Sequence, residues 1–174
     1  MGGIERRSHG IDEYLNMQIL YFPSDAGTTR GGVMKRFASA VDIHAPAARI
    51  WGLLTDSVHY PDWNPTVQSV EGAIVPGARI VVRPADNPKR AFSLKVSAFA
   101  PPHRMVWSGG MPLGLFLGER VFQLTQTRAD TVRFSMQGTF SRPLSGLIGK
   151  SIPDLQPAFD DFAAALKRRA EAEH

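Results

Sequence analysis

Residues 90–99 read RAFSLKVSAF, and this stretch decides the fold class. Every second residue from Phe92 to Ala98 is apolar, whereas the residues between them are Ser93, Lys95 and Ser97. Strict alternation is typical of an antiparallel strand that turns one face to a core and the other to water. We therefore expect a sheet with one apolar face, which another element must cover.

Six further segments on either side show the same two-residue period. They are residues 37–43, 66–71, 78–83, 104–108, 119–127 and 131–140. Glycine or proline follows most of these segments, as is expected where consecutive strands are joined by turns. Long strands twist, so the series predicts one curved antiparallel sheet of six to seven strands.

Two short helices are predicted after the first strand. Pro46 suits the first turn of a helix, because a backbone N–H at that place would lack an intrahelical partner. Asp56 or Ser57 is expected to cap a second helix that runs to Trp63, and Pro65 ends it by restricting the residue before it.

The C-terminal stretch changes period. Its apolar residues step by three, four, three and four, at Ile152, Leu155, Phe159, Phe162 and Leu166. This is a narrow apolar stripe on a helix of about 20 residues. The predicted class is therefore α+β, with the sheet wrapped around this long final helix.

The apolar face of the sheet exceeds what that stripe can cover. The face is expected to carry Phe92, Leu94, Met105, Trp107, Phe122, Leu124, Phe134 and Met136. The surplus either leaves a pocket between sheet and helix or is filled to make a solid core. The periodicity alone leaves both alternatives open.

Composition narrows the classes of function. The chain has 174 residues, 43% of them hydrophobic and 21% charged, which is ordinary for a globular domain. The net charge of +4 is scattered, without the basic face of a nucleic-acid-binding protein, so no nucleic-acid partner is expected. Cysteine is absent and the five histidines are widely separated, so we expect no metal and no cofactor.

Targeting signals are also missing from the sequence. No apolar run approaches the roughly 20 residues of a transmembrane helix, and Ile19 to Phe22 is too short for a signal-peptide core. We expect a cytoplasmic protein.

Residues 1–34 differ from the rest of the chain. Glycines open and close the segment, and only Ile11, Leu15, Ile19 and Phe22 fall on one face of a helix. The segment is either a short amphipathic helix or a loosely ordered extension. Residues 35–174 are predicted to form the ligand-binding domain.

Several motifs in this order resemble a known family. They are FASAVDIHAP at residues 37–46, LLTD at 53–56, YPDWNP at 60–65, Trp107, and the final Phe159, Phe162 and Leu166. Together they resemble the START-like helix-grip (SRPBCC) superfamily, in its polyketide cyclase/dehydrase-like branch. The resemblance implies a Bet v 1-like fold with a deep hydrophobic cavity between the sheet and the last helix. It carries over no catalytic motif, because the branch has no universal one.

The resemblance makes the inward-facing residues candidates for ligand contact. They are Trp63, Phe92, Leu94, Met105, Trp107, Arg120, Phe122, Leu124, Phe134, Met136, Leu155, Phe159 and Phe162. Arg120 shares the parity of Phe122 and Leu124, so it should point inward, either to hold a ligand carboxylate or phenolate or to pair with an acid at the rim.

Catalytic machinery is not evident, and His59, Tyr60 and Arg120 are weak candidates. His59 could act as a general base near neutral pH, or it is a surface residue of the loop before the second strand. No nucleophile motif accompanies them.

Residues 111–118 are apolar where a loop is normally polar. We interpret Leu113, Leu115, Phe116 and Leu117 as a lid over the cavity, with homodimer contact or membrane contact as alternatives.

The predicted function is binding of a lipid-like or polyketide-like small molecule in an internal cavity. The alternative is an aromatase/cyclase or dehydrase that encloses its substrate in the same cavity. A third hypothesis, a protein-interaction module, would use the apolar loop and the N-terminal helix.

Overall fold

The sheet has seven antiparallel strands in the order β1-β7-β6-β5-β4-β3-β2. The computed structural model describes residues 33–110, 117–142 and 153–172. The strands are β1 (Val33–Ile43), β2 (Val67–Glu71), β3 (Arg79–Pro84), β4 (Phe92–Ala100), β5 (Arg104–Gly110), β6 (Leu117–Arg128) and β7 (Thr131–Arg142). This sheet confirms the predicted α+β helix-grip architecture and its strand segments.

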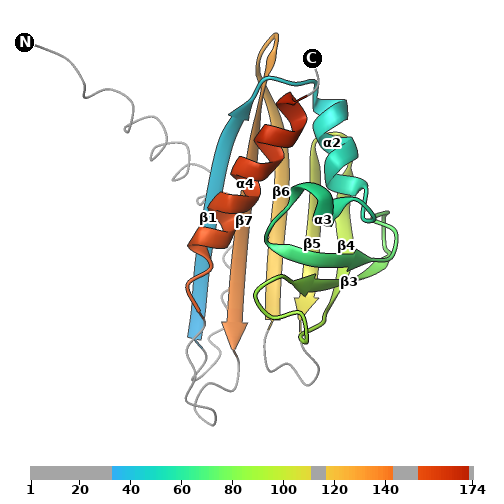
Figure 1. Ribbon diagram of the computed structural model, residues 1–174, viewed down its shortest axis with the longest axis vertical. Helices are drawn as coiled ribbons and strands as arrows, with labels where there is room; N and C mark the ends of the chain where they lie inside the picture. Colours follow the sequence, from blue (N-terminus) through green and yellow to red (C-terminus); the bar gives the residue numbers. More distant parts are fainter. Residues whose placement is uncertain (1–32, 111–116, 143–152, 173–174) are drawn as a thin grey trace, which may run out of the picture. The chain divides into compact units, whose positions relative to one another are not determined.

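In the described residues, three helices accompany the sheet: α2 (Ala47–Thr55), α3 (Tyr60–Trp63) and α4 (Gln156–Glu171). In Figure 1, α4 lies along β1 and β7, whereas α2 and α3 lie in front of the other half of the sheet. None of these helices, within the described ranges, is long and hydrophobic enough to span a bilayer.

The predicted cap of the second short helix is wrong. Helix α3 begins at Tyr60, with His59 before it and no side-chain cap. Asp56 instead ends α2, where its backbone N–H donates to the carbonyl of Gly52. Pro61 lies in the first turn of α3, where a backbone N–H would have no intrahelical partner, so this turn can form without a cap.

The last helix is shorter than predicted. Helix α4 begins at Gln156, after Leu155, and Pro157 lies in its first turn. Asp154 precedes the helix and its carboxylate accepts a hydrogen bond from the Gln156 N–H at 3.0 Å. Ile152 lies outside the described residues, as does the helix predicted between Ile11 and Phe22.

The alternation of side chains holds along β7 and fails at the end of β4. In β7 the predicted apolar residues from Val132 to Phe140 are all buried. In β4 the pairing with β5 shifts between Ser97 and Ala100, and Ala98 has a positive φ of 45°. The irregularity turns Ala98 outward, against the prediction, and Phe99 packs on Trp51 with ring centroids 5.3 Å apart.

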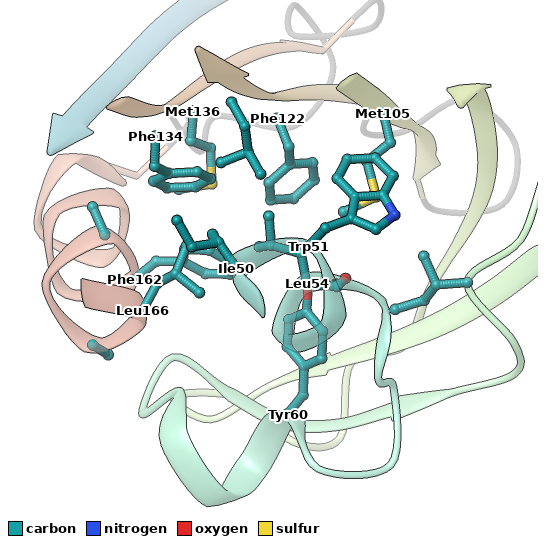
Figure 2. Packing of buried hydrophobic residues seen from close by; sticks show 14 of the residues in the cluster. Ile50, Trp51, Leu54, Tyr60, Met105, Phe122, Phe134, Met136, Phe162 and Leu166 are labelled. Carbon is teal, nitrogen blue, oxygen red and sulfur yellow. Dashed lines mark hydrogen bonds between the residues drawn. The ribbon is translucent and has the colours of Figure 1, made fainter. Parts of the chain in front are cut away.

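Phe162 is the centre of the core. Its ring centroid lies 5.3 Å from that of Trp63, 5.8 Å from Phe122 and 5.9 Å from Phe134. Figure 2 shows Phe162 and Leu166 of α4 facing Phe122, Phe134 and Met136 of the sheet. One side chain of α4 thus joins the sheet to α3.

Truncation of Phe162 should therefore be costly. We expect Phe162→Ala to lower the free energy of unfolding by about 3–5 kcal/mol, because it removes a buried ring and leaves a cavity. Urea denaturation would measure the change. The exposed neighbour Ala164 offers a control, since Ala164→Ser should change stability by no more than about 0.5 kcal/mol. Equal effects of the two substitutions would contradict the central place of Phe162.

Helix α4 also holds the outer edge of β1. The Gln156 side-chain amide donates to the carbonyl of Ala38 at 2.7 Å, and the Lys167 ammonium donates to the carbonyl of Asp42. At the C-terminal end of α4, the Glu171 carboxylate accepts a hydrogen bond from the His44 N–H at 2.8 Å. Unpaired edge groups template aggregation, so these bonds protect the edge strand as well as position the helix.

The carboxylate of Asp42 faces Arg133 across the outer side of the sheet. Arg133 Nε and Nη2 donate to its two oxygens at 2.8 and 2.9 Å. The hydrogen bonds from Arg133 hold the pKa of Asp42 below its ordinary value of 3.8, with burial acting in the opposite direction. The stabilisation is therefore complete above pH 3.8 and is lost as the pH falls through the lower pKa of the folded state.

This pair predicts a pH-dependent effect of Asp42→Asn. At pH 7 the variant should be less stable than the parent by about 0.5–1 kcal/mol, since the pair is half-exposed. The difference should shrink towards zero in the acid range below the ordinary pKa of Asp42. Denaturation curves from pH 7 to pH 2 would measure it, with the exposed Asp86→Asn as a control that changes nothing; a constant difference across that range would refute the assignment.

Candidate functional site

Strand register places five inward-facing residues in one row across the sheet. From β1 to β4 they are Phe37, Gly138, Arg120, Trp107 and Val96. Arg120 lies in the middle of this row, between a glycine and an indole. The inward direction predicted for Arg120 from its parity is the one found in the structure.

Arg120 is a cation in an apolar environment. Its guanidinium carbon lies 4.9 Å from the centroid of the Phe159 ring of α4. Removal from water lowers the pKa of Arg120 to about 10, and the neighbouring Tyr60 has a smaller, opposite effect. Arg120 is therefore still positively charged at neutral pH.

No carboxylate pairs with Arg120 among the residues that the structure describes. The arginine ion pairs Arg83–Glu71 and Arg133–Asp42 involve other positions. A cation–π contact contributes about 0.5–2 kcal/mol, whereas an ion removed from water loses several kcal/mol of solvation. Phe159 thus compensates only part of this loss, and Arg120 keeps part of its surface exposed.

The next row towards the strand ends contains two adjacent glycines. Across β7, β6, β5 and β4, this row reads Phe140, Gly118, Gly109 and Leu94. Gly109 has a φ of +146°, and an added Cβ would collide with the carbonyl oxygen of Ser93, so a side chain is excluded there. Beside Arg120 the sheet is thus bare of side chains over two strands, and we call Gly109 and Gly118 the glycine floor.

Gly138 lies in the same row as Arg120 and leaves space for two aromatic rings. A Cβ at this position would collide with Cζ of Phe159 and would lie 2.6 Å from Cε2 of Phe140. The missing side chain lets both rings lie against the sheet. Phe159 can therefore reach the guanidinium of Arg120.

Alanine at Gly138 should disturb this arrangement. We expect Gly138→Ala to destabilise the fold by about 1–3 kcal/mol, because the new methyl group displaces buried rings. Gly52→Ala is the matched control: Gly52 lies inside α2 with no atom near its missing Cβ, so alanine should be neutral or stabilising by about 0.5–1 kcal/mol. Thermal unfolding of both variants measures the contrast; an unaffected Gly138→Ala would mean that the two rings do not depend on this glycine.

The other two catalytic candidates, His59 and Tyr60, do not present a free proton-transfer group at the inner face of the sheet. His59 is 65% exposed, and its Nδ1 lies 2.7 Å from a carboxylate oxygen of Asp56. Tyr60 is buried, and its hydroxyl donates to the carbonyl of Leu54 at 2.9 Å. Burial raises the pKa of Tyr60 far above its usual range, so its phenol is neutral at physiological pH.

The candidate ligand-contact residues fall into two groups. Nearly all surface is lost from Trp63, Met105, Trp107, Phe122, Leu124, Phe134, Met136, Phe159 and Phe162. Part of the surface remains on Phe92, Leu94, Arg120 and Leu155. Ligand contact by either group stays a prediction.

The predicted lid lies mostly outside the described residues, which include neither Leu113, Leu115 nor Phe116. Leu117 is the first residue of β6 and is 43% exposed. Within the described ranges, no three histidine, aspartate or glutamate residues come close enough to hold a metal ion.

The glycine floor was missed by the sequence reasoning. Gly109 reads as the turn that ends a strand and Gly118 as a hinge of the apolar loop, yet both lie inside strands. The signal was their parity, because Gly109 continues the inward series of Met105 and Trp107, and Gly118 precedes Arg120 and Phe122 by two and four residues.

Comparison with known families gives one match that covers most of the chain. Residues 34–171 match the family described as polyketide cyclase / dehydrase and lipid transport. The chain belongs to this family. The resemblance found in the sequence motifs is thereby confirmed. A comparison with curated proteins gave no match.

Solved structures with a similar fold include proteins from bacteria and from a plant. The Zhui aromatase/cyclase from Streptomyces sp. R1128 has 19% identity and a TM-score of 0.63, over 80% of this chain and 94% of its own. Norcoclaurine synthase from Thalictrum flavum, solved with dopamine and hydroxybenzaldehyde, has 14% identity and a TM-score of 0.60, over 88% and 95%. A hypothetical protein from Helicobacter pylori has 13% identity and a TM-score of 0.66, over 79% and 88%. At these identities the likeness concerns the fold.

Proposed function

We propose that this protein binds a hydrophobic, lipid-like or polyketide-like small molecule on the inner face of its sheet, at the glycine floor. The observation that carries the proposal is the contrast between the two halves of that face. Around Phe122 and Phe134 the side chains have no exposed surface, whereas Leu94 and Phe37 near the floor keep some. Inward apolar surface that the protein leaves uncovered is a place for an apolar guest.

The location follows from the shape of the floor. Two glycines side by side place no side chain of their own on the inner face, and the flanking residues Phe140 and Leu94 are apolar. Leu155, just before α4, is a partly exposed apolar residue that packs against the same core. A flat hydrophobic molecule or an acyl chain would lie on backbone that side chains cover elsewhere.

Family membership supports the class of ligand. The family description names both polyketide chemistry and lipid transport, and both involve hydrophobic molecules. The aromatase/cyclase fold neighbour also supports a polyketide-like guest. Fold alone does not decide between carrier and enzyme.

We favour binding without catalysis over the aromatase/cyclase alternative. A cyclase would need proton-transfer groups at the ligand. In the described part of the chain, His59 lies at the surface and the Tyr60 hydroxyl is committed to Leu54. No observation on the described residues specifically favours turnover.

A side chain placed on the floor should abolish binding. The neutral dye N-phenyl-1-naphthylamine, which fluoresces in apolar sites, should bind the parent protein and lose at least about 90% of its signal in Gly118→Leu, because leucine fills the space of the guest. The control is Glu119→Leu, which places the same leucine side chain one residue away on the opposite, exposed face of β6.

Circular dichroism of both variants would verify that the sheet is retained. Unchanged dye binding by folded Gly118→Leu, or equal loss in both variants, would contradict the proposed location. Absence of dye binding by the parent would contradict the proposed function itself.

A further inference from the structure

Arg120 has a charge that nothing in the described part of the protein neutralises. Its contacts are the face of the Phe159 ring and an electrostatic interaction with Tyr60, whose phenol is neutral.

The groups around Arg120 are hydrogen-bond donors. The Nε1 atom of its cross-strand neighbour Trp107 is buried and has no acceptor among the described residues. Tyr60, whose ring lies 5.9 Å from that of Trp107, already donates its hydroxyl hydrogen to Leu54. A guest that entered this region would meet donors in need of acceptors, and one that brought further donors would leave them unsatisfied.

Arg120 also marks the inner limit of the glycine floor. Gly118 precedes Arg120 by two residues on β6, which is a distance of about 7 Å along a strand. Beyond Arg120, the next inward residue is Phe122, which is fully buried among other rings. A guest lying on the floor would therefore have one end at the guanidinium and could advance no further.

We propose, on the basis of the function proposed above, that the ligand is an anionic amphiphile, bound with its carboxylate or enolate innermost at Arg120 and its apolar body on the glycine floor. A carboxylate supplies the acceptors that the guanidinium lacks, and the pair would form where water is scarce. Gly138 and Phe159 are positioning residues in this arrangement, because the glycine admits the ring and the ring holds the guanidinium over the sheet.

Matched ligands that differ only in charge test this inference. Dodecanoate with 1-dodecanol, and 2-naphthoate with 2-naphthalenemethanol, would be titrated into the full chain by calorimetry at pH 7. In each pair the acid should bind at least about tenfold more tightly than the alcohol, as expected for a charge-assisted hydrogen bond at a desolvated site. In Arg120→Met, the acid and the alcohol should bind with about equal affinity. Arg120→Lys should keep part of the preference for the acid.

A surface arginine provides the control for net charge. Arg83→Met removes a positive charge from a pair with Glu71 on the exposed part of the sheet, and should leave the acid preference unchanged. A second measurement separates loss of binding from loss of folding. Without ligand, Arg120→Met should melt at a higher temperature than the parent, because methionine needs no counter-charge.

The outcomes distinguish this inference from the proposed function. Equal affinity for acid and alcohol in the parent protein overturns the anionic class but leaves hydrophobic binding in place. A preference that survives in Arg120→Met, or a lower melting temperature of that variant, overturns the role of Arg120. Failure of the neutral dye to bind the parent protein would overturn the proposed function, and with it the inference that rests on it.

Discussion

The contact on which the rest of this structure depends is the packing of Phe162 against the rings of the sheet and of α3. Phe162 lies within 6.3 Å, centroid to centroid, of Tyr60, Trp63, Phe122 and Phe134. Tyr60 and Trp63 belong to α3, whereas Phe122 and Phe134 belong to the hairpin of β6 and β7. Because their rings meet at one side chain, the position of α4 over the sheet is determined at this point.

The position of α4 then determines the candidate site. Phe159 lies three residues before Phe162, so it faces the same side of the helix about one turn away. Gly138 on β7 leaves room for that ring, which in turn lies against the guanidinium of Arg120. Gln156 and Lys167 donate hydrogen bonds to the edge of β1, and Glu171 accepts one from the His44 N–H, so the helix is held in place along the sheet.

The inner face thus combines a half packed with buried side chains and a half with two adjacent glycines. The solid half, around Phe122, Phe134 and Met136, provides the burial that stabilises the fold. The other half has two adjacent glycines and an arginine for which the described residues supply no carboxylate, where larger apolar side chains would be more stabilising. Residues that pack poorly in a core are typical of functional sites. The stability that they lose is supplied by the rest of the domain.

The sequence by itself determined the strands, the direction of their side chains and the stripe of α4. These features depend on the two-residue period of a strand and the 3.6-residue period of a helix, and both periods are local. The inward direction of Arg120 could therefore be predicted from Phe122 and Leu124 alone. The tertiary structure decided which residues meet across the sheet. The cap expected at Asp56 and the inward direction expected for Ala98 were wrong, because a proline-started turn and a shift in the β4–β5 pairing replaced the regular pattern. The adjacency of Gly109 and Gly118, and the absence of an acid beside Arg120 in the described chain, depend on the register between strands distant in sequence, which no local period contains.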